Sequence, residues 1–302
     1  MLEVTGPVEH ARDIYGYVPT RNTTIVFIVL FSLSTAVHMA QIVRSRTWHF
    51  IPTVGLCGAL EIIGWSGRLW SSISPQLDPP FIISITNTIL APSPLLAANF
   101  ILSSGIIRRL GPVYSRLGAR GYSITFCTAN VVAFIVQLMG TGLVAASLTR
   151  QEKDPTVGVN IVLEGIIIQL AMITFHILLM SEFIVRYVKN AHVLPVSSRM
   201  ARHCFMNRDL LMVGCALAFS STCLFIRTLY RTIELRVGWD RRIFRTEIYF
   251  TVFDGAMVVL AIYSLHLAHI TGLSRSQGHL DASDSMGLAR IGTANPEHSQ
   301  VT

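Results

Sequence analysis

The chain has 302 residues, of which 51% are hydrophobic and only 14% are charged, and its formal net charge is +7. A soluble domain carries about 25% charged residues, so this composition argues against a soluble protein and favours one that uses lipid as its solvent. In a soluble protein the basic excess would suggest a nucleic-acid partner. Here the Lys and Arg residues lie mainly in loops beside apolar stretches, so membrane topology explains them and no nucleic-acid partner is expected.

Apolar stretches of about 20 residues, each long enough to cross ~30 Å of hydrocarbon, recur along the chain between short polar loops. They predict an all-α polytopic membrane protein, a seven-transmembrane-helix bundle. The expected spans are residues 22–43, 49–71, 81–107, 121–148, 157–185, 209–234 and 243–270. Residues 1–21 form a polar segment without the apolar core of a signal peptide. Residues 271–302 form a polar tail that we expect to be disordered in the cytosol.

The third expected span contains two prolines, Pro92 and Pro94, near its centre. Proline removes a backbone donor from the helix, and the carbonyl groups that it frees need other partners. We therefore expect this span to be kinked or broken, which is compatible with a simple packing kink as well as with a functional one.

The distribution of basic residues gives an orientation, because Lys and Arg concentrate on the cytosolic side of membranes. The first, third and fifth loops and the tail hold thirteen such residues: Arg44, Arg46, Arg108, Arg109, Arg116, Arg120, Arg186, Lys189, Arg199, Arg202, Arg208, Arg275 and Arg290. The other side holds seven: Arg12, Arg21, Arg150, Lys153, Arg236, Arg241 and Arg242. The N-terminus is therefore expected outside and the C-terminus in the cytosol, with the plasma membrane as the expected location and another endomembrane as the alternative.

Polar side chains within the spans are the most informative positions, because they are costly in lipid and usually face the interior of a bundle. In the sixth span such side chains lie at offsets of 0, 3, 4 and 7 residues: Arg227, Tyr230, Arg231 and Glu234. In the second span the same offsets hold Glu61, Gly64, Trp65 and Arg68, and these offsets share one helix face. The candidate substrate-binding residues of a polar cavity are Glu61, Arg68, Asn130, Gln137, Gln169, Arg227, Arg231, Glu234, Glu247 and Asp254.

The predicted orientation places the acidic and basic members of this set in one layer toward the outer side, with Glu61 closer to mid-depth. One interpretation is a network that only locks the helices in register, with each buried charge satisfied by another. The other is a site for an amphiphile with a charged head, in which acids engage an amine and arginines engage a phosphate or hydroxyl group.

The histidines fall at a different depth from the acids, so no metal centre is expected. His38, His266 and His269 lie near the cytosolic ends of their spans, and His176 lies in an inner half. His266 would lie ~18 Å along a helix from Asp254. The sequence also contains no G-x-S-x-G elbow, Walker A motif or nucleotide-binding glycine loop. We therefore expect no catalytic residues, no cofactor and no enzymatic activity.

The segment from Arg227 to Glu234, followed by Gly238, Glu247 and the pair Phe253–Asp254, resembles the signature of the fungal RTA-like family. This family is also called the lipid-translocating exporter family. The segments at residues 15–19, 61–68, 91–98, 130–137 and 158–169 also resemble that family, so the similarity runs from about residue 15 to residue 269. The sequence departs from the family at Asn130, where an aspartate is usual, and at Phe100, where a tyrosine is usual.

The resemblance implies seven spans with the N-terminus outside. It also implies resistance to toxic amphiphiles, such as sterol-like compounds, and export or translocation of sphingoid long-chain bases. The expected partners are accordingly membrane lipids or amphiphilic small molecules. Two alternatives remain open from the residues: a seven-span lipid sensor or receptor, and an intramembrane lipid hydrolase that uses histidine and acidic side chains.

Overall fold

The computed structural model describes residues 17–149, 155–191, 208–237 and 246–266, and these residues are helical apart from short connections. The elements are α2 (Arg21–Ser45), η1 (Trp48–Phe50), η2 (Ile51–Gly55), α3 (Leu56–Ile73), α4 (Asp78–Leu90), α5 (Pro92–Leu110), η3 (Pro112–Tyr114), α6 (Ala119–Thr149), α7 (Thr156–Ala191), α8 (Arg208–Val237), α9 (Glu247–Phe250), η4 (Thr251–Ala256) and α10 (Met257–Ser264). The predicted N-terminal segment and C-terminal tail lie almost entirely outside the described residues.

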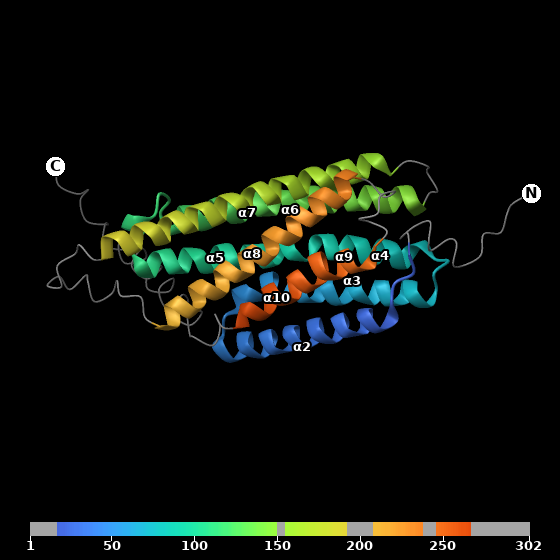
Figure 1. The fold of residues 1–302 in the computed structure, drawn as a ribbon, viewed down its shortest axis with the longest axis horizontal. Helices are drawn as coiled ribbons and strands as arrows, with labels where there is room; N and C mark the ends of the chain where they lie inside the picture. Colours follow the sequence, from blue (N-terminus) through green and yellow to red (C-terminus); the bar gives the residue numbers. More distant parts are fainter. Residues whose placement is uncertain (1–16, 150–154, 192–207, 238–245, 267–302) are drawn as a thin grey trace, which may run out of the picture.

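The helices lie side by side along the long axis of the molecule, with α6 and α7 on one edge, α2 on the opposite edge, and α8 crossing between them at a slant (Figure 1). At one end of the bundle Arg68 donates a hydrogen bond to Tyr17, and the backbone of Thr20 donates one to Glu247. We call this the Tyr17 end. At the other end Arg116 pairs with Glu182, and we call it the Arg116 end.

Among the described residues, six helical segments are long and apolar enough to cross a membrane: 21–45, 78–110, 119–149, 156–189, 210–237 and 247–264. They confirm an all-helical, multi-pass membrane protein. The expected second span corresponds to η2 and α3. That segment is not one of the six, because Glu61, Arg68 and several small polar residues lower its hydropathy. It nevertheless packs within the bundle, in contact with α2, α4 and α5.

The third expected span is interrupted, as its prolines predicted. α4 ends at Leu90 and α5 begins at Pro92, with Ala91 between them in a helical conformation. Because Ala91 continues the helical path, Pro92 follows Thr88 by four residues and has no N–H group to donate to its carbonyl, which therefore needs another donor. The combined segment 78–110 is also the most deeply buried of the six, with 67% of its apolar window inside the bundle.

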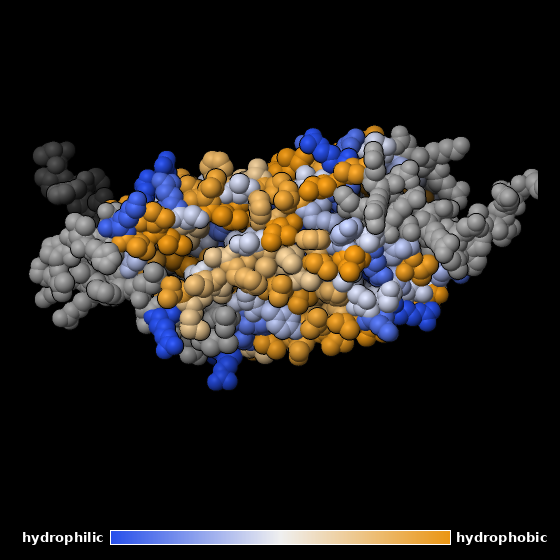
Figure 2. All heavy atoms as spheres, in the orientation of Figure 1, coloured by the Kyte–Doolittle hydropathy of each residue, from blue (hydrophilic) through white to orange (hydrophobic). Residues whose placement is uncertain are grey.

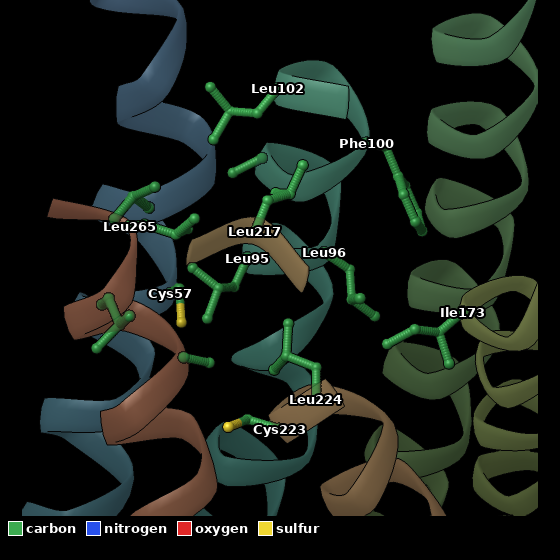
Figure 3. Packing of buried hydrophobic residues seen from close by; sticks show 14 of the residues in the cluster. Cys57, Leu95, Leu96, Phe100, Leu102, Ile173, Leu217, Cys223, Leu224 and Leu265 are labelled. Atoms are coloured by element: carbon green, nitrogen blue, oxygen red, sulfur yellow. The ribbon is translucent and has the colours of Figure 1, made fainter. Parts of the chain in front are cut away.

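The core of the bundle forms around α5. Figure 3 shows Leu95 and Leu96 of α5 surrounded by Cys57 of α3, Leu217 and Leu224 of α8, and Ile173 of α7. On the face drawn in Figure 2, hydrophobic residues predominate along the middle of the molecule, and the most hydrophilic residues lie toward its two ends. Apolar side chains on both the inside and the outside of a helix bundle are typical of a protein that is surrounded by lipid.

Candidate functional site

Asp254 is the centre of a buried ion network at the Tyr17 half of the bundle. Its Oδ1 lies 2.8 Å from Nε of Arg227 and 2.8 Å from Nε of Arg231. Nη2 of Arg231 donates to Oδ2 of Asp254 at 2.9 Å, and Nη1 of the same side chain donates to Glu234 at 2.9 Å. All four side chains are at most 3% exposed, so the structure brings together four of the residues that the sequence selected.

The local sequence explains this arrangement. Arg227, Arg231 and Glu234 lie on one face of α8, because residues four and seven apart in a helix are neighbours on its surface. Asp254 faces them from η4, a short stretch of π-helix. The wider π turn rotates the side chains that follow it and is frequent at functional sites. The next residue, Gly255, packs so tightly that a Cβ atom there would lie 2.6 Å from the Trp65 ring.

Thr88 of α4 completes the network from a third helix. Its carbonyl oxygen accepts a hydrogen bond from Nη2 of Arg227, and its hydroxyl accepts one from Nη2 of Arg231 at 3.1 Å. The Thr88 carbonyl lies in the last turn of α4, four residues before Pro92. Proline has no N–H group to donate to that carbonyl. The break in the third span therefore provides a backbone acceptor for a buried arginine.

Glu61 lies on α3 beside this network but is bonded differently. Oε2 of Glu61 accepts a hydrogen bond from Nε1 of Trp65 at 3.1 Å. Oε1 is buried and has no hydrogen-bond partner within the described part of the chain. The carboxyl group is 1% exposed. Glu61 is therefore a buried acid that, in the described residues, hydrogen-bonds to an indole and to no arginine.

Arg68, about two helix turns beyond Glu61 on α3, faces the Tyr17 end. Its guanidinium group lies over the ring of Phe250, 4.1 Å from the centroid, and donates a hydrogen bond to the Tyr17 hydroxyl. The pKa of Tyr17 lies above its ordinary value because burial disfavours the phenolate, although the positive charge of Arg68 acts in the opposite direction. A space of about 20 Å³ lies between these groups and Arg231, which is room for one water molecule.

Glu247 lies apart from the ion network. Its carboxylate accepts hydrogen bonds from the backbone N–H and the hydroxyl of Thr20, at 2.9 and 2.7 Å. It thus connects the beginning of α9 to the beginning of α2. The sequence grouped Glu247 with the other charges, and its hydrogen-bond partner in the structure is Thr20, which is far from it in the sequence.

Asn130, Gln137 and Gln169 form a second group, centred on Ser93 in the first turn of α5. Asn130 donates to the Ser93 carbonyl at 2.8 Å, and Gln137 donates to the side-chain oxygen of Gln169 at 2.8 Å. The Ser93 hydroxyl lies 3.3 Å from the side chains of both glutamines. These amides connect α5, α6 and α7, and they are separate from the ion network in the hydrogen bonds of the described residues.

We predict that Asn130→Asp lowers the stability of this protein. The resemblance to the RTA-like family described above gives aspartate as the usual residue at this position, but the contacts of Asn130 in this chain favour the amide. Asn130 donates to the Ser93 carbonyl, whereas a carboxylate can only accept. Leaving that buried carbonyl without its donor should cost about 1–3 kcal/mol. Thermal unfolding of the purified protein in nanodiscs measures the loss. Val131→Ala, at the neighbouring position that is 52% exposed, is the control, and equal melting temperatures for Asn130→Asp and the wild type would contradict the prediction.

A third polar group was not selected from the sequence. Asn99 of α5 donates to Ser220 and Ser221 of α8 at 3.1 and 3.4 Å, and Ser221 also lies 3.2 Å from Nε2 of His176. Asn99 could have been found by the rule that found Asn130, since both are amides within an apolar span. The serines carry no comparable signal, because serine satisfies itself on a helix backbone and is common in membrane helices.

Two further histidines, His38 and His266, pack against each other inside the bundle. The rings of His38 and His266 stack with their centroids 3.7 Å apart, toward the Arg116 half of the bundle. Within the described ranges, no three His, Cys, Asp or Glu side chains come close enough to hold a metal ion. The His38–His266 pair joins α2 to the end of α10, and its neighbours Ser34 and Gln41 both lie on α2.

Comparison with known proteins identifies the relatives of this chain. A model of the RTA1-like protein family matches residues 54–277. The sphingoid long-chain base transporter RSB1 of Saccharomyces cerevisiae is 24% identical over 305 residues, which cover 90% of this chain and 79% of the relative. Protein RTM1 of the same organism is 25% identical, over 82% of this chain and 89% of its own length.

A further yeast relative, protoporphyrin uptake protein 1, is 23% identical over 86% of this chain and 92% of its own length. No solved structure matches the chain. The family match covers most of the sequence, including the ion network on α8 and η4, the amide group on α6 and α7, and the central helix α5. The chain therefore belongs to the RTA1-like protein family.

Proposed function

We propose that this protein translocates or exports amphiphilic lipids of the sphingoid long-chain base type, and that it thereby raises the tolerance of the cell to such compounds. The observation that carries the proposal is the buried carboxyl oxygen Oε1 of Glu61, which has no hydrogen-bond partner within the described residues. A buried acid without a cationic partner is costly. The amine of a long-chain base is a cation that could pair with it.

The neighbouring ion network fits a role in transport rather than in catalysis. Arg227 and Arg231 share one counter-ion, Asp254, and Arg231 has Glu234 as a second. A cationic head group that approaches Glu61 would also meet this balanced set of charges, which can exchange partners as the head passes. The space beside Arg68 holds only about one water molecule, so a lipid head group can enter this space only if the surrounding helices move apart during transport.

The names of two yeast relatives support the same class of activity. One is called a sphingoid long-chain base transporter and the other a protoporphyrin uptake protein. Both names describe the movement of an amphiphilic compound, and neither describes an enzyme. On this ground we propose that the present chain is also a transport protein rather than an enzyme. We keep the plasma membrane as its proposed location, as expected from the sequence.

We further propose that Ile51–Ile73 is a seventh span and that the Tyr17 end faces outward. At about 1.5 Å per residue the segment is roughly 33 Å long, enough for the hydrocarbon core. Its two charged residues, Glu61 and Arg68, are at most 2% exposed, so they would not meet lipid. The excess of basic residues in the loops of the Arg116 end supports its placement in the cytosol.

Reconstituted vesicles provide the direct test of the function. We expect purified protein to move a fluorescent long-chain base across the bilayer faster than protein-free vesicles do. Glu61→Gln should reduce that rate by at least about tenfold, since it removes the charge that would pair with the amine while an amide oxygen can still accept from Trp65. Glu164→Gln, the same chemical change on an exposed face of α7, should leave the rate unchanged.

The possible outcomes separate the two parts of the proposal. If the long-chain base crosses vesicles that contain the wild-type protein no faster than it crosses protein-free vesicles, the proposed transport function is wrong. If transport occurs and Glu61→Gln retains the full rate with an unchanged melting temperature, the assignment of Glu61 is wrong and transport stands. Saturable binding of the base without movement would favour the lipid-sensor alternative.

A further inference from the structure

A groove lies between α5, α7 and α8 in the Arg116 half of the bundle, away from the ion network. It encloses about 350 Å³, whereas the space beside Arg68 encloses about 20 Å³. Sites for small molecules have volumes of about 300–1,000 Å³. A water molecule occupies about 30 Å³ of liquid, and a methylene group is of similar size, so the groove has room for on the order of ten methylene groups.

The walls of the groove are apolar and one side is open. Ile106 of α5 and Met180 of α7 belong to the lining, as do Leu211 and Cys215 of α8. Leu211 is 49% exposed and Cys215 is also exposed, so the groove opens sideways between α7 and α8, onto the surface that faces lipid. Figure 1 shows α8 slanting away from α7 toward this end. No Asp, Glu, Lys or Arg belongs to the lining within the described residues.

The deep end of the groove is polar. His176 and Ser221 both line it, and they are 2% exposed. The Tyr122 hydroxyl lies 2.7 Å from Nδ1 of His176. Buried hydroxyl groups find an acceptor, and this nitrogen is the partner found for Tyr122 in the described residues. The proton of the neutral imidazole then lies on Nε2, which donates to Ser221 at 3.2 Å.

This assignment leaves Ser221 with one hydrogen to donate. Its oxygen accepts from His176, and also from Nδ2 of Asn99 at 3.4 Å. A hydroxyl group has two acceptor lone pairs and one donor, so both lone pairs are used. Among the described residues no hydrogen bond joins the O–H group of Ser221 to a backbone carbonyl, so this group can donate to an acceptor in the groove. A neutral oxygen, such as an alcohol, fits this position better than a cation does.

The position of Ser221 is also informative. It lies 13 residues after the first residue of α8, Arg208, or about 20 Å along the helix. A head group that binds at Ser221 therefore lies well below the membrane surface, near the middle of a ~30 Å hydrocarbon core. The open side of the groove allows the hydrocarbon chain of the same molecule to remain against the apolar walls or in lipid.

We propose that this groove binds one single-chain amphiphile whose head carries a hydroxyl group, with that group accepting a hydrogen bond from Ser221 and the chain lying between α7 and α8. This inference rests on the proposed function and identifies the place where the lipid is taken up. The closed space beside Arg68 and the open groove then describe a conformation that accepts lipid from the half of the membrane at the Arg116 end.

Alkylation of the native Cys215 tests whether the groove is occupied. Full-length protein in nanodiscs is treated with a maleimide in the presence of a long-chain amino diol, and each cysteine is followed by mass spectrometry. When the concentration of the amino diol is about ten times its dissociation constant, the alkylation of Cys215 should slow by roughly tenfold, because only the unoccupied fraction of the protein reacts. Cys127 of α6, which lies outside the groove, should react at an unchanged rate, and a short-chain amino alcohol should protect neither.

Two variants with matched controls locate the bound molecule. Gly214 lines the groove and its Cβ position is open, so Gly214→Phe should fill the space and abolish the protection of Cys215. Gly142→Phe, at another open position on an exposed face of α6, should leave the protection of Cys215 unchanged. Ser221→Ala should weaken binding of the amino diol by roughly three- to tenfold, while binding of an alkylamine of equal chain length should not change.

Failure of this inference can be told apart from failure of the proposed function. If the protein transports a long-chain base but Cys215 is never protected, the groove is not the site and transport stands. Unchanged protection in Gly214→Phe would also overturn the groove as the site. Equal effects of Ser221→Ala on the amino diol and on the alkylamine would overturn the hydroxyl contact. If Cys215 is protected but no lipid moves, the binding site stands and transport is wrong.

Discussion

Asp254→Asn should destabilise this protein by about 3–5 kcal/mol, the cost of leaving buried charges without their partner. Asp254 is the shared counter-ion of Arg227 and Arg231, and all three side chains are at most 1% exposed. The amide keeps the shape of the carboxylate but removes its charge. Arg231 retains Glu234, whereas Arg227 loses the carboxylate with which it is paired in the described chain and keeps neutral acceptors, the carbonyl of Thr88 and the new amide oxygen.

The matched control for this prediction is Glu247→Gln. It is the same conversion of an acid to an amide in the same segment of the chain, but Glu247 is only half-buried and its hydrogen bonds with Thr20 are exposed. Its effect should stay below about 1 kcal/mol, because exposed polar contacts contribute little. Thermal unfolding in nanodiscs, followed by tryptophan fluorescence, gives both values. Melting temperatures that fall equally for the two variants would show that Asp254 does not anchor the arginines.

The second large effect concerns the contact between α6 and α7. A Cβ atom at Gly140 would lie 2.6 Å from the backbone nitrogen of Val162, and one at Gly158 would lie 2.7 Å from that of Val144. These neighbours are backbone atoms, which cannot move aside as a flexible side chain does. Gly140→Ala should therefore push the two helices apart and destabilise the protein by about 1–3 kcal/mol or more.

Gly142→Ala, two residues further along the same helix, is a control for which we expect the free energy of unfolding to change in the opposite direction. Its Cβ position has no atom within 4 Å. Alanine should stabilise α6 there by about 0.5–1 kcal/mol, because glycine loses more backbone freedom when a helix forms. Unfolding in nanodiscs again gives the comparison. If both alanine variants shift the melting temperature in the same direction, the close approach of α6 and α7 is wrong.

The sequence was most informative where a polar residue lies within an apolar span. Arg227, Arg231 and Asp254 could be selected because charges inside lipid are costly and must face a partner. Helical spacing also placed the two arginines and Glu234 on one face of α8. The network of these residues with Asp254 is therefore a consequence of helix geometry and of the cost of burying charge, both of which can be read from the sequence.

The partners of these residues could not be predicted with the same rules. Thr88 and Ser93 hold buried arginines and amides through their hydroxyl and carbonyl groups, but neither stands out among the many serines and threonines of the spans. Glu247 resembles the other acids in sequence, and only the approach of Thr20 explains why it lies apart. The groove has no sequence signal, because its volume depends on the angle between α7 and α8.

The sequence by itself determined that this is a multi-pass helical membrane protein, that its third span is interrupted at the prolines, and which residues carry charge inside it. These properties follow from the composition of single segments. Only the tertiary structure decided which polar residues share a cluster, how little space surrounds the charges, and where a groove opens to lipid. Those properties depend on the crossing angles and distances between helices, which are set by the packing of side chains far apart in the chain.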